Sequence, residues 1–111
     1  MNKVEHHASI CKELNETYRK KNSAYGDSFG ETYRKLGIIS AVTRITDKYN
    51  RLVTLATNAD ISENDESLTD TLLDMANYCI MTVMEMESAG AAGDGTSLAA
   101  RLERMTRGVQ A

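Results

Sequence analysis

Apolar residues recur at every third or fourth position along most of this chain, which is the spacing of one face of an α-helix. In the first such segment, about residues 4–22, Ile10, Leu14 and Tyr18 form one apolar stripe and the other faces are charged. A predicted loop follows over residues 23–27, and its glycine suits the end of a helix. No segment alternates apolar and polar residues as a strand does, so the pattern predicts an all-α fold.

Two more helices are predicted in the middle of the chain, on either side of Gly37. Ser28 and Glu31 have the S-x-x-E spacing of a capping box and predict a helix over about residues 29–36. Glycine destabilises a helix interior by about 1 kcal/mol, so a break or kink is expected at Gly37. A long helix with one narrow apolar stripe follows over about residues 38–57.

A central helix is predicted over about residues 66–88, after a polar connection at residues 58–65. Leu73, Ile80 and Met84 lie outside its main apolar stripe, so this helix is apolar on several sides. A helix of this kind belongs in the middle of an assembly, and we expect it to lie at a subunit interface as well.

The last part of the chain has a different composition. The small residues at 89–96 predict a linker, and residues 97–111 predict a short helix that is too short to be stable alone. The sequence therefore predicts an all-α domain over residues 1–88, followed by this linker and a C-terminal helix. The expected architecture is a helical bundle of four to five helices, assembled as a dimer or a higher homo-oligomer.

The composition of the 111 residues excludes several classes of function. A net charge of −3 and an isoelectric point near 5.3 argue against general nucleic-acid binding, because little would neutralise the phosphates. The chain shows neither a secretory signal nor an apolar run of the roughly 20 residues that cross a membrane. We therefore expect a cytoplasmic protein, in the host cytoplasm if a phage encodes it. Cys11 and Cys79 occupy apolar positions and are expected to be buried free thiols, with a disulfide as the alternative.

Three polar residues form a stripe on the otherwise apolar central helix. Asp70, Asp74 and Asn77 are spaced by four and three residues, which places them on one face. Neighbouring carboxylates repel each other unless a positive charge lies nearby, and oxygen ligands at this spacing suit Mg²⁺ or Mn²⁺. The alternative is a solvated face near the N-terminus of the helix, where the helix dipole favours acidic residues.

Three basic residues form a matching stripe on the preceding long helix. Arg44, Lys48 and Arg51 have the same four-and-three spacing and flank its apolar seam. They could face the acidic stripe, or they could grip phosphate groups, which arginine binds with a bidentate fork and lysine binds as a point charge. The alternative is an exposed face on which Asp47 and Arg51 form a local pair.

The junction between the first two helices is a third candidate site. A helix ends there, a glycine turn follows and a new helix begins, and a helix N-terminus attracts anions. Lys21 and Asn22 could bind phosphate or the edge of a base, and Tyr25 could stack on the base. The alternative is an ordinary loop with a packed tyrosine.

Three motifs taken together resemble a known family. They are K-N-x-x-Y-G-D-S-F at residues 21–29, R-x-x-D-K-x-x-R-L at residues 44–52 and D-T-L-L-D-x-A-N-Y at residues 70–78. In this order they are similar to the phage and bacterial nucleotide-modification-associated domain. That family is in turn similar to the all-α NTP pyrophosphatases, which include MazG-type enzymes and dimeric dUTPases. The resemblance covers about residues 13–84.

The resemblance implies a metal site. In the pyrophosphatases, acidic residues in E-x-x-E and E-x-x-D patterns hold Mg²⁺ against a nucleotide triphosphate. Glu13 and Glu16 match the first pattern, and Asp70 matches the aspartate of the second. Ser67 stands where the second pattern has its glutamate, and Asp74 is the expected substitute. This departure bears on hydrolysis more than on nucleotide binding.

These features lead to three hypotheses about function. The first is a metal-dependent nucleotide pyrophosphohydrolase, in which Asp70 and Asp74 act in catalysis and, with Glu13 and Glu16, hold Mg²⁺ or Mn²⁺. The second is a nucleotide-binding protein with an anti-defence role, which sequesters a cyclic or ADP-ribose-type immune signal without cleaving it. The third is a structural helical oligomer. In the first two hypotheses the residues expected to contact the nucleotide are Lys21, Asn22, Tyr25, Arg44, Lys48, Arg51 and Asn77.

Overall fold

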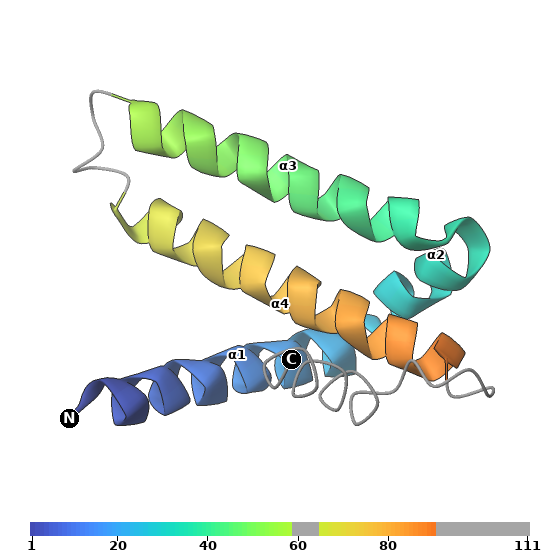
Figure 1. Ribbon diagram of the computed structural model, residues 1–111, viewed down its shortest axis with the longest axis horizontal. Helices are drawn as coiled ribbons and strands as arrows, with labels where there is room; N and C mark the ends of the chain where they lie inside the picture. Colours follow the sequence, from blue (N-terminus) through green and yellow to red (C-terminus); the bar gives the residue numbers. More distant parts are fainter. Residues whose placement is uncertain (59–64, 91–111) are drawn as a thin grey trace, which may run out of the picture.

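The computed structural model describes residues 1–58 and 65–90, and the regular elements in this part of the chain are all α-helices. The helices are α1 (Lys3–Tyr25), α2 (Ser28–Leu36), α3 (Ile38–Thr57) and α4 (Asp65–Gly90) (Figure 1). The all-α prediction is therefore confirmed for the described residues. Most of the linker predicted at 89–96, the whole helix predicted at 97–111 and most of the connection at 58–65 lie outside the described residues.

Helix α1 is longer than the sequence pattern predicts. Its N-terminus is capped by Asn2, whose side-chain oxygen accepts a hydrogen bond from the backbone N–H of Glu5 at 2.8 Å. The loop predicted at 23–27 is wrong over its first three residues, which continue the helix to Tyr25. Gly26 ends the helix, because its φ of 70° is a conformation that glycine adopts without strain.

The start of α2 is shifted from the prediction by one residue. The N-cap is Asp27, whose carboxylate accepts a hydrogen bond from the N–H of Gly30 at 3.2 Å, and Ser28 is the first helical residue. The capping box predicted from Ser28 and Glu31 is therefore wrong. Aspartate caps a helix as well as serine does, and Asp27 has a second contact because its carboxylate lies 3.6 Å from the guanidinium of Arg34.

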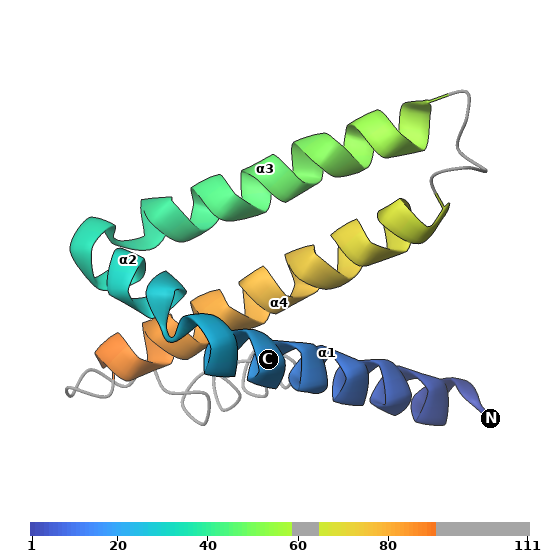
Figure 2. The ribbon, with the colours of Figure 1, turned by 180° about the vertical axis from the view of Figure 1, so that it is seen from behind.

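Helices α3 and α4 form an antiparallel hairpin that makes up much of the fold (Figures 1 and 2). Gly37, with a φ of 76°, ends α2 and lets the chain turn directly into α3. Helices α1 and α2 also contact α4, so α4 is the central helix of the chain, as the sequence predicts.

Few apolar side chains are buried among the described residues of the single chain. Leu14 and Ala41 are the buried apolar residues of the described part, and no large side chain there is fully buried. Thr71 and Thr82 are buried as well, and each hydroxyl donates to the carbonyl oxygen four residues earlier at 2.7 Å. The apolar stripe of each helix is therefore wider than the area over which that helix contacts the other helices of the same chain.

The two cysteines lie in apolar stripes but outside the contacts between helices. Cys11 and Cys79 are free, but both are exposed, so the prediction that they are buried is wrong. Helical periodicity places Cys11 about 60° round α1 from the buried Leu14, beside the contact with α4 and not on it. Among the described helices, none is both long enough and apolar enough to span a lipid bilayer.

Candidate functional site

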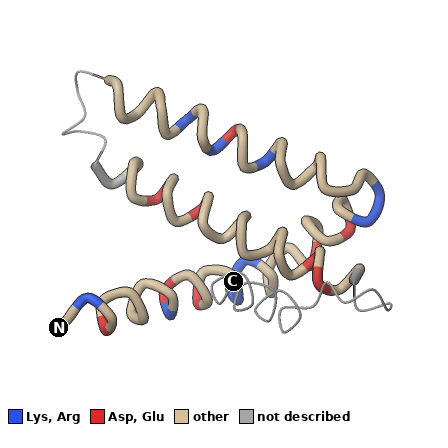
Figure 3. The backbone as a smooth tube through the Cα atoms, viewed as in Figure 1, with Lys and Arg blue, Asp and Glu red and all other residues tan. Residues whose placement is uncertain are grey.

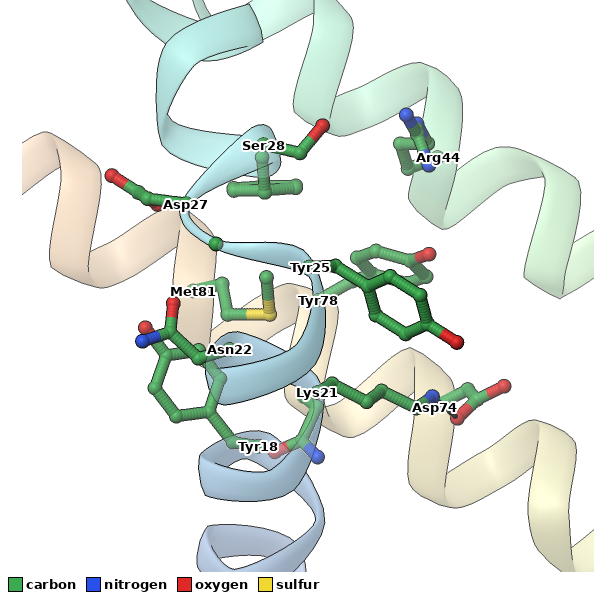
Figure 4. A pocket seen from close by; sticks show the side chains of 13 residues that line it. Tyr18, Lys21, Asn22, Tyr25, Asp27, Ser28, Arg44, Asp74, Tyr78 and Met81 are labelled. Atoms are coloured by element: carbon green, nitrogen blue, oxygen red, sulfur yellow. Dashed lines mark hydrogen bonds and ion pairs between the residues drawn. The ribbon is translucent and has the colours of Figure 1, made fainter.

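A pocket lies where the end of α1 and the start of α2 meet the α3–α4 hairpin (Figure 4). Its cavity volume is about 230 Å³. Six of the residues singled out from the sequence line it, namely Lys21, Asn22, Tyr25, Arg44, Asp74 and Asn77. The three candidate regions, which are far apart in the sequence, therefore contribute to one site.

The carboxylate of Asp74 is the meeting point of two lysine side chains. Lys21 Nζ, from α1, lies 3.4 Å from Asp74 Oδ1, and Lys48 Nζ, from α3, lies 3.2 Å from Asp74 Oδ2. Figure 4 shows Lys21 extending from α1 to this carboxylate. One carboxylate thus pairs with two ammonium groups from different helices, and the three side chains together carry a net positive charge.

Arg44 and Arg51, the two arginines of the basic stripe, add further positive charge along α3 (Figure 3). Arg51 Nε donates to the hydroxyl of the buried Thr71 on α4 at 3.3 Å. Arg44 lines the pocket and makes no hydrogen bond or ion pair with another residue of the described part of the chain. The basic stripe therefore faces the acidic helix through Lys48 and Arg51, and Arg44 is available to an anion.

Aromatic side chains form the other walls of the pocket. Tyr25, at the end of α1, is 79% exposed, so a ligand can reach its ring. Phe29 and Tyr78 pack against each other with ring centroids 5.8 Å apart and join α2 to α4 beside the cavity. Sequence patterning places Tyr18 in the apolar stripe of α1 and assigns no role in the site to Phe29 or Tyr78, although these two residues end two of the three motifs.

Asn77 lines the pocket and also connects two helices. Its Nδ2 donates to the backbone carbonyl oxygen of Leu14 at 3.2 Å, which joins α4 to α1. Leu14 is also the buried side chain of α1. Together these contacts fix the position of α1 on α4 and so place Lys21, two turns further along α1, at the pocket.

The four acidic residues predicted to bind a metal do not come together. Glu16 pairs with Arg19 on α1, and the hydrogen bond and the charge of that guanidinium lower the pKa of the Glu16 carboxyl. Helical periodicity places Glu16 about 160° round α1 from Leu14, which packs toward α4. Glu13 and Asp70 are exposed.

This arrangement of donors does not fit a divalent cation. Asp74 is already engaged by two ammonium groups, which compete with a metal for its oxygens. Within residues 1–58 and 65–90, no group of three or more His, Cys, Asp or Glu side chains is placed to hold a metal ion. The chemistry that the pocket offers is the attraction of an anion by ammonium and guanidinium groups.

The comparisons with known proteins give one match. No curated protein and no solved structure matches the chain. The model of one protein family, described as nucleotide modification associated domain 1, matches residues 21–86. The match covers more than half of the chain and includes the end of α1, all of α2 and α3 and most of α4, which are the elements that build the pocket. The chain therefore belongs to the nucleotide modification associated domain 1 family.

Proposed function

We propose that this protein binds a nucleotide and holds its phosphate groups with Lys21 and Arg44, which line the pocket, and with Lys48 beside it. The observation that carries the proposal is the convergence of Lys21 and Lys48 on the single carboxylate of Asp74. Arg44 lies at the same pocket, unpaired within the described residues. Phosphate oxygens accept charge-assisted hydrogen bonds from such groups. The description of the family, which refers to nucleotide modification, agrees with a nucleotide ligand.

The ligand is held at two places in this proposal. Its phosphates bind the two lysines as point charges and Arg44 as a planar fork that donates to two oxygens at once. Its base stacks on the exposed ring of Tyr25, and Asn22, one turn earlier on α1, bonds to the edge of the base. Arg51, which lies further along α3 and contacts Thr71, would meet a longer phosphate chain.

Binding without cleavage is the form of this function that the geometry supports best. The likeness to the all-α NTP pyrophosphatases implies hydrolysis with Mg²⁺ or Mn²⁺ held by acidic residues of α1 and α4. Those side chains do not converge in the structure, and Asp74 already engages two lysines, so we derive no hydrolytic step. A protein that binds a nucleotide and does not cleave it sequesters that nucleotide.

The test is to incubate the purified chain with a panel of canonical, cyclic and ADP-ribose-type nucleotides, first in EDTA and then with Mg²⁺ or Mn²⁺. Free nucleotide is measured before and after the protein is denatured by heat. We expect depletion in EDTA that reverses on denaturation, with the nucleotide recovered intact. Depletion that requires metal and releases phosphate or pyrophosphate would contradict sequestration and establish a hydrolase.

A matched pair of variants tests whether the pocket is the binding site. Arg44→Gln removes the guanidinium and should weaken nucleotide binding by about 10-fold or more, because a hydrogen bond to a charged group contributes about 1.5–3 kcal/mol. Lys35→Gln removes the same charge from the exposed end of α2, outside the pocket, and should leave the Kd unchanged. Equal effects of the two variants in isothermal titration calorimetry would show that only overall charge matters.

A further inference from the structure

The side of α3 that faces away from the pocket carries an apolar stripe. Ile38, Val42, Tyr49 and Val53 are 45%, 47%, 54% and 42% exposed. At about 100° per residue, these four side chains lie within about 60° of one another around the helix. Arg44, which lines the pocket, lies about 150° from the centre of this stripe.

Helix α4 carries a second apolar stripe of the same kind. Leu72, Cys79 and Met86 are spaced by seven residues, which keeps them within about 40° of one another. Leu72 is 48% exposed, Met86 is 40% exposed and Cys79 is exposed as well. Asp74 lies about 140° from Cys79 around the helix and marks the pocket side of α4.

The two stripes form one continuous surface. Lys48 meets Asp74 and the helices run antiparallel, so Tyr49 is level with Leu72 to within one residue (Figure 1). The same register places Val42 level with Cys79 to within one residue and Ile38 level with Met86 to within two, and Val53 lies about one turn beyond Leu72. Because both helices are right-handed and antiparallel, the stripes point to the same side of the hairpin, opposite the pocket. We call the two stripes together the apolar face.

No charged residue interrupts the apolar face. The residues that fill the gaps in its two stripes are Leu, Ile, Met, Val, Ala or Thr. Its extent is about 22 Å along the helices and about 20 Å across the two of them, which is comparable with the largest apolar patches on monomers, and such patches are often functional. A surface that covers it must be uncharged as well, because burial of an unpaired charge is unfavourable.

We infer that the apolar face is where a second copy of this chain docks, so that two α3–α4 hairpins pack face to face as a four-helix bundle. An identical copy supplies an uncharged surface of the same length, and a two-fold axis brings the two surfaces together. The dimer also adds to a small core, because Leu14 and Ala41 are the buried apolar residues of the part of the chain that the structure describes. The inference goes beyond the proposed function and needs no nucleotide, since each pocket lies on the outer side of its hairpin.

Light scattering on the full chain without nucleotide measures its mass in solution. We expect about 25 kDa at micromolar concentration, which is twice the 12.3 kDa of one chain. A mass of one chain throughout the micromolar range overturns the proposal, whether the face is then covered by another segment of the same chain or meets a different partner.

Two variants test whether the apolar face is the surface that dimerises. Val42→Glu places a charge on the face and should weaken dimerisation by about 100-fold or more, because the two-fold axis buries that charge twice. Thr54→Glu places the same charge at an exposed position of α3, about 130° from the centre of the stripe, and should leave the dimer unchanged. A V42E dimer as tight as that of the unmodified chain overturns the proposal.

The two cysteines give a second measurement, which does not depend on the folding of a variant. Cys79 lies on the apolar face and Cys11 lies on α1, and both are exposed in the single chain. Thiol alkylation followed by mass spectrometry should show Cys79 becoming protected relative to Cys11 as the protein concentration rises through the dimerisation range. Relative rates that do not change with concentration overturn the proposal, even if the mass is that of a dimer.

Discussion

The pocket side and the apolar face of the α3–α4 hairpin differ in how far their side chains find contact partners within one chain. On the pocket side, Lys48 Nζ lies 3.2 Å from Asp74 and Arg51 Nε lies 3.3 Å from Thr71. On the apolar face, Val42 remains about half exposed. Ionic contacts depend on geometry and salt, whereas apolar contacts depend on the area removed from water. The same change of sequence or solvent should therefore affect the two sides differently.

The largest effect is expected at a position between the two sides. Ala41 is completely buried, and helical periodicity places it on the side of α3 that carries Lys48 and packs on α4. Ala41→Leu overpacks this contact and should lower the free energy of unfolding by about 1–3 kcal/mol in urea denaturation. Ala8→Leu, at an exposed position of α1, should change it by less than about 0.5 kcal/mol. Equal stability of the two variants would contradict close packing at Ala41.

A change in salt concentration should affect nucleotide binding on the pocket side and leave dimerisation through the apolar face unchanged. Raising NaCl from about 0.01 M to about 1 M shortens the Debye length from about 30 Å to about 3 Å. Nucleotide affinity should fall by about 10-fold, because the charge contacts with the phosphates contribute about 0.2–1 kcal/mol each and are screened. The mass of the dimer should not change, because apolar contacts are not screened. Dissociation of the dimer in high salt would place ion pairs in its interface.

A smaller effect is expected when the Asp74 carboxylate, which Lys21 and Lys48 share, is removed. Asp74→Asn frees the ammonium groups of Lys21 and Lys48 for phosphate and removes a repelling charge. Nucleotide binding in EDTA should become about 2- to 5-fold tighter, since each of these partly exposed ion pairs contributes about 0.2–1 kcal/mol. Glu5→Gln, at an exposed position near the start of α1 and outside the pocket, removes the same charge as a control and should have no effect. Loss of binding in the Asp74 variant would show that its carboxylate contacts the ligand.

The smallest effect is expected at the pair of Glu16 and Arg19 on α1, which belongs to neither side of the hairpin. The guanidinium holds the pKa of the Glu16 carboxyl below its ordinary value. A carboxyl whose pKa is lowered by folding stabilises the folded state above its unfolded-state pKa, and this contribution is lost as the pH falls through the folded-state pKa. The pair is exposed, so the stability should not change measurably. An NMR titration should find a higher Glu16 pKa in Arg19→Ala, and an unchanged pKa would show that the pair does not persist in solution.

The helices could be predicted from the sequence because apolar periodicity and glycine mark them. Gly26 and Gly37 both adopt positive φ angles, and each ends a helix near the expected place. The start of α2 could not be predicted to the residue, since Asp27 and Ser28 are equally good caps by residue type. The further contact between Asp27 and Arg34 exists only after α2 has formed.

The pocket could be predicted in part, because three motifs contain the charged residues that line it. The spacing of Glu13 and Glu16 does not reveal which side of α1 faces α4, and the packing of Leu14 decides that side. The width of an apolar stripe likewise does not reveal how many chains share it. Cys79 is therefore exposed in one chain although it lies within such a stripe.

The turn between α1 and α2 concentrates the pocket in a short part of the chain. Eight of the thirteen residues that line the pocket lie within residues 18–29, and the other five come from α3 and α4. A single recombination event across this stretch would exchange most of the pocket wall and leave the packing of the hairpin in place. Ligand preference and the scaffold can thus diverge separately among members of the family, and a designer could exchange the same twelve residues as one cassette.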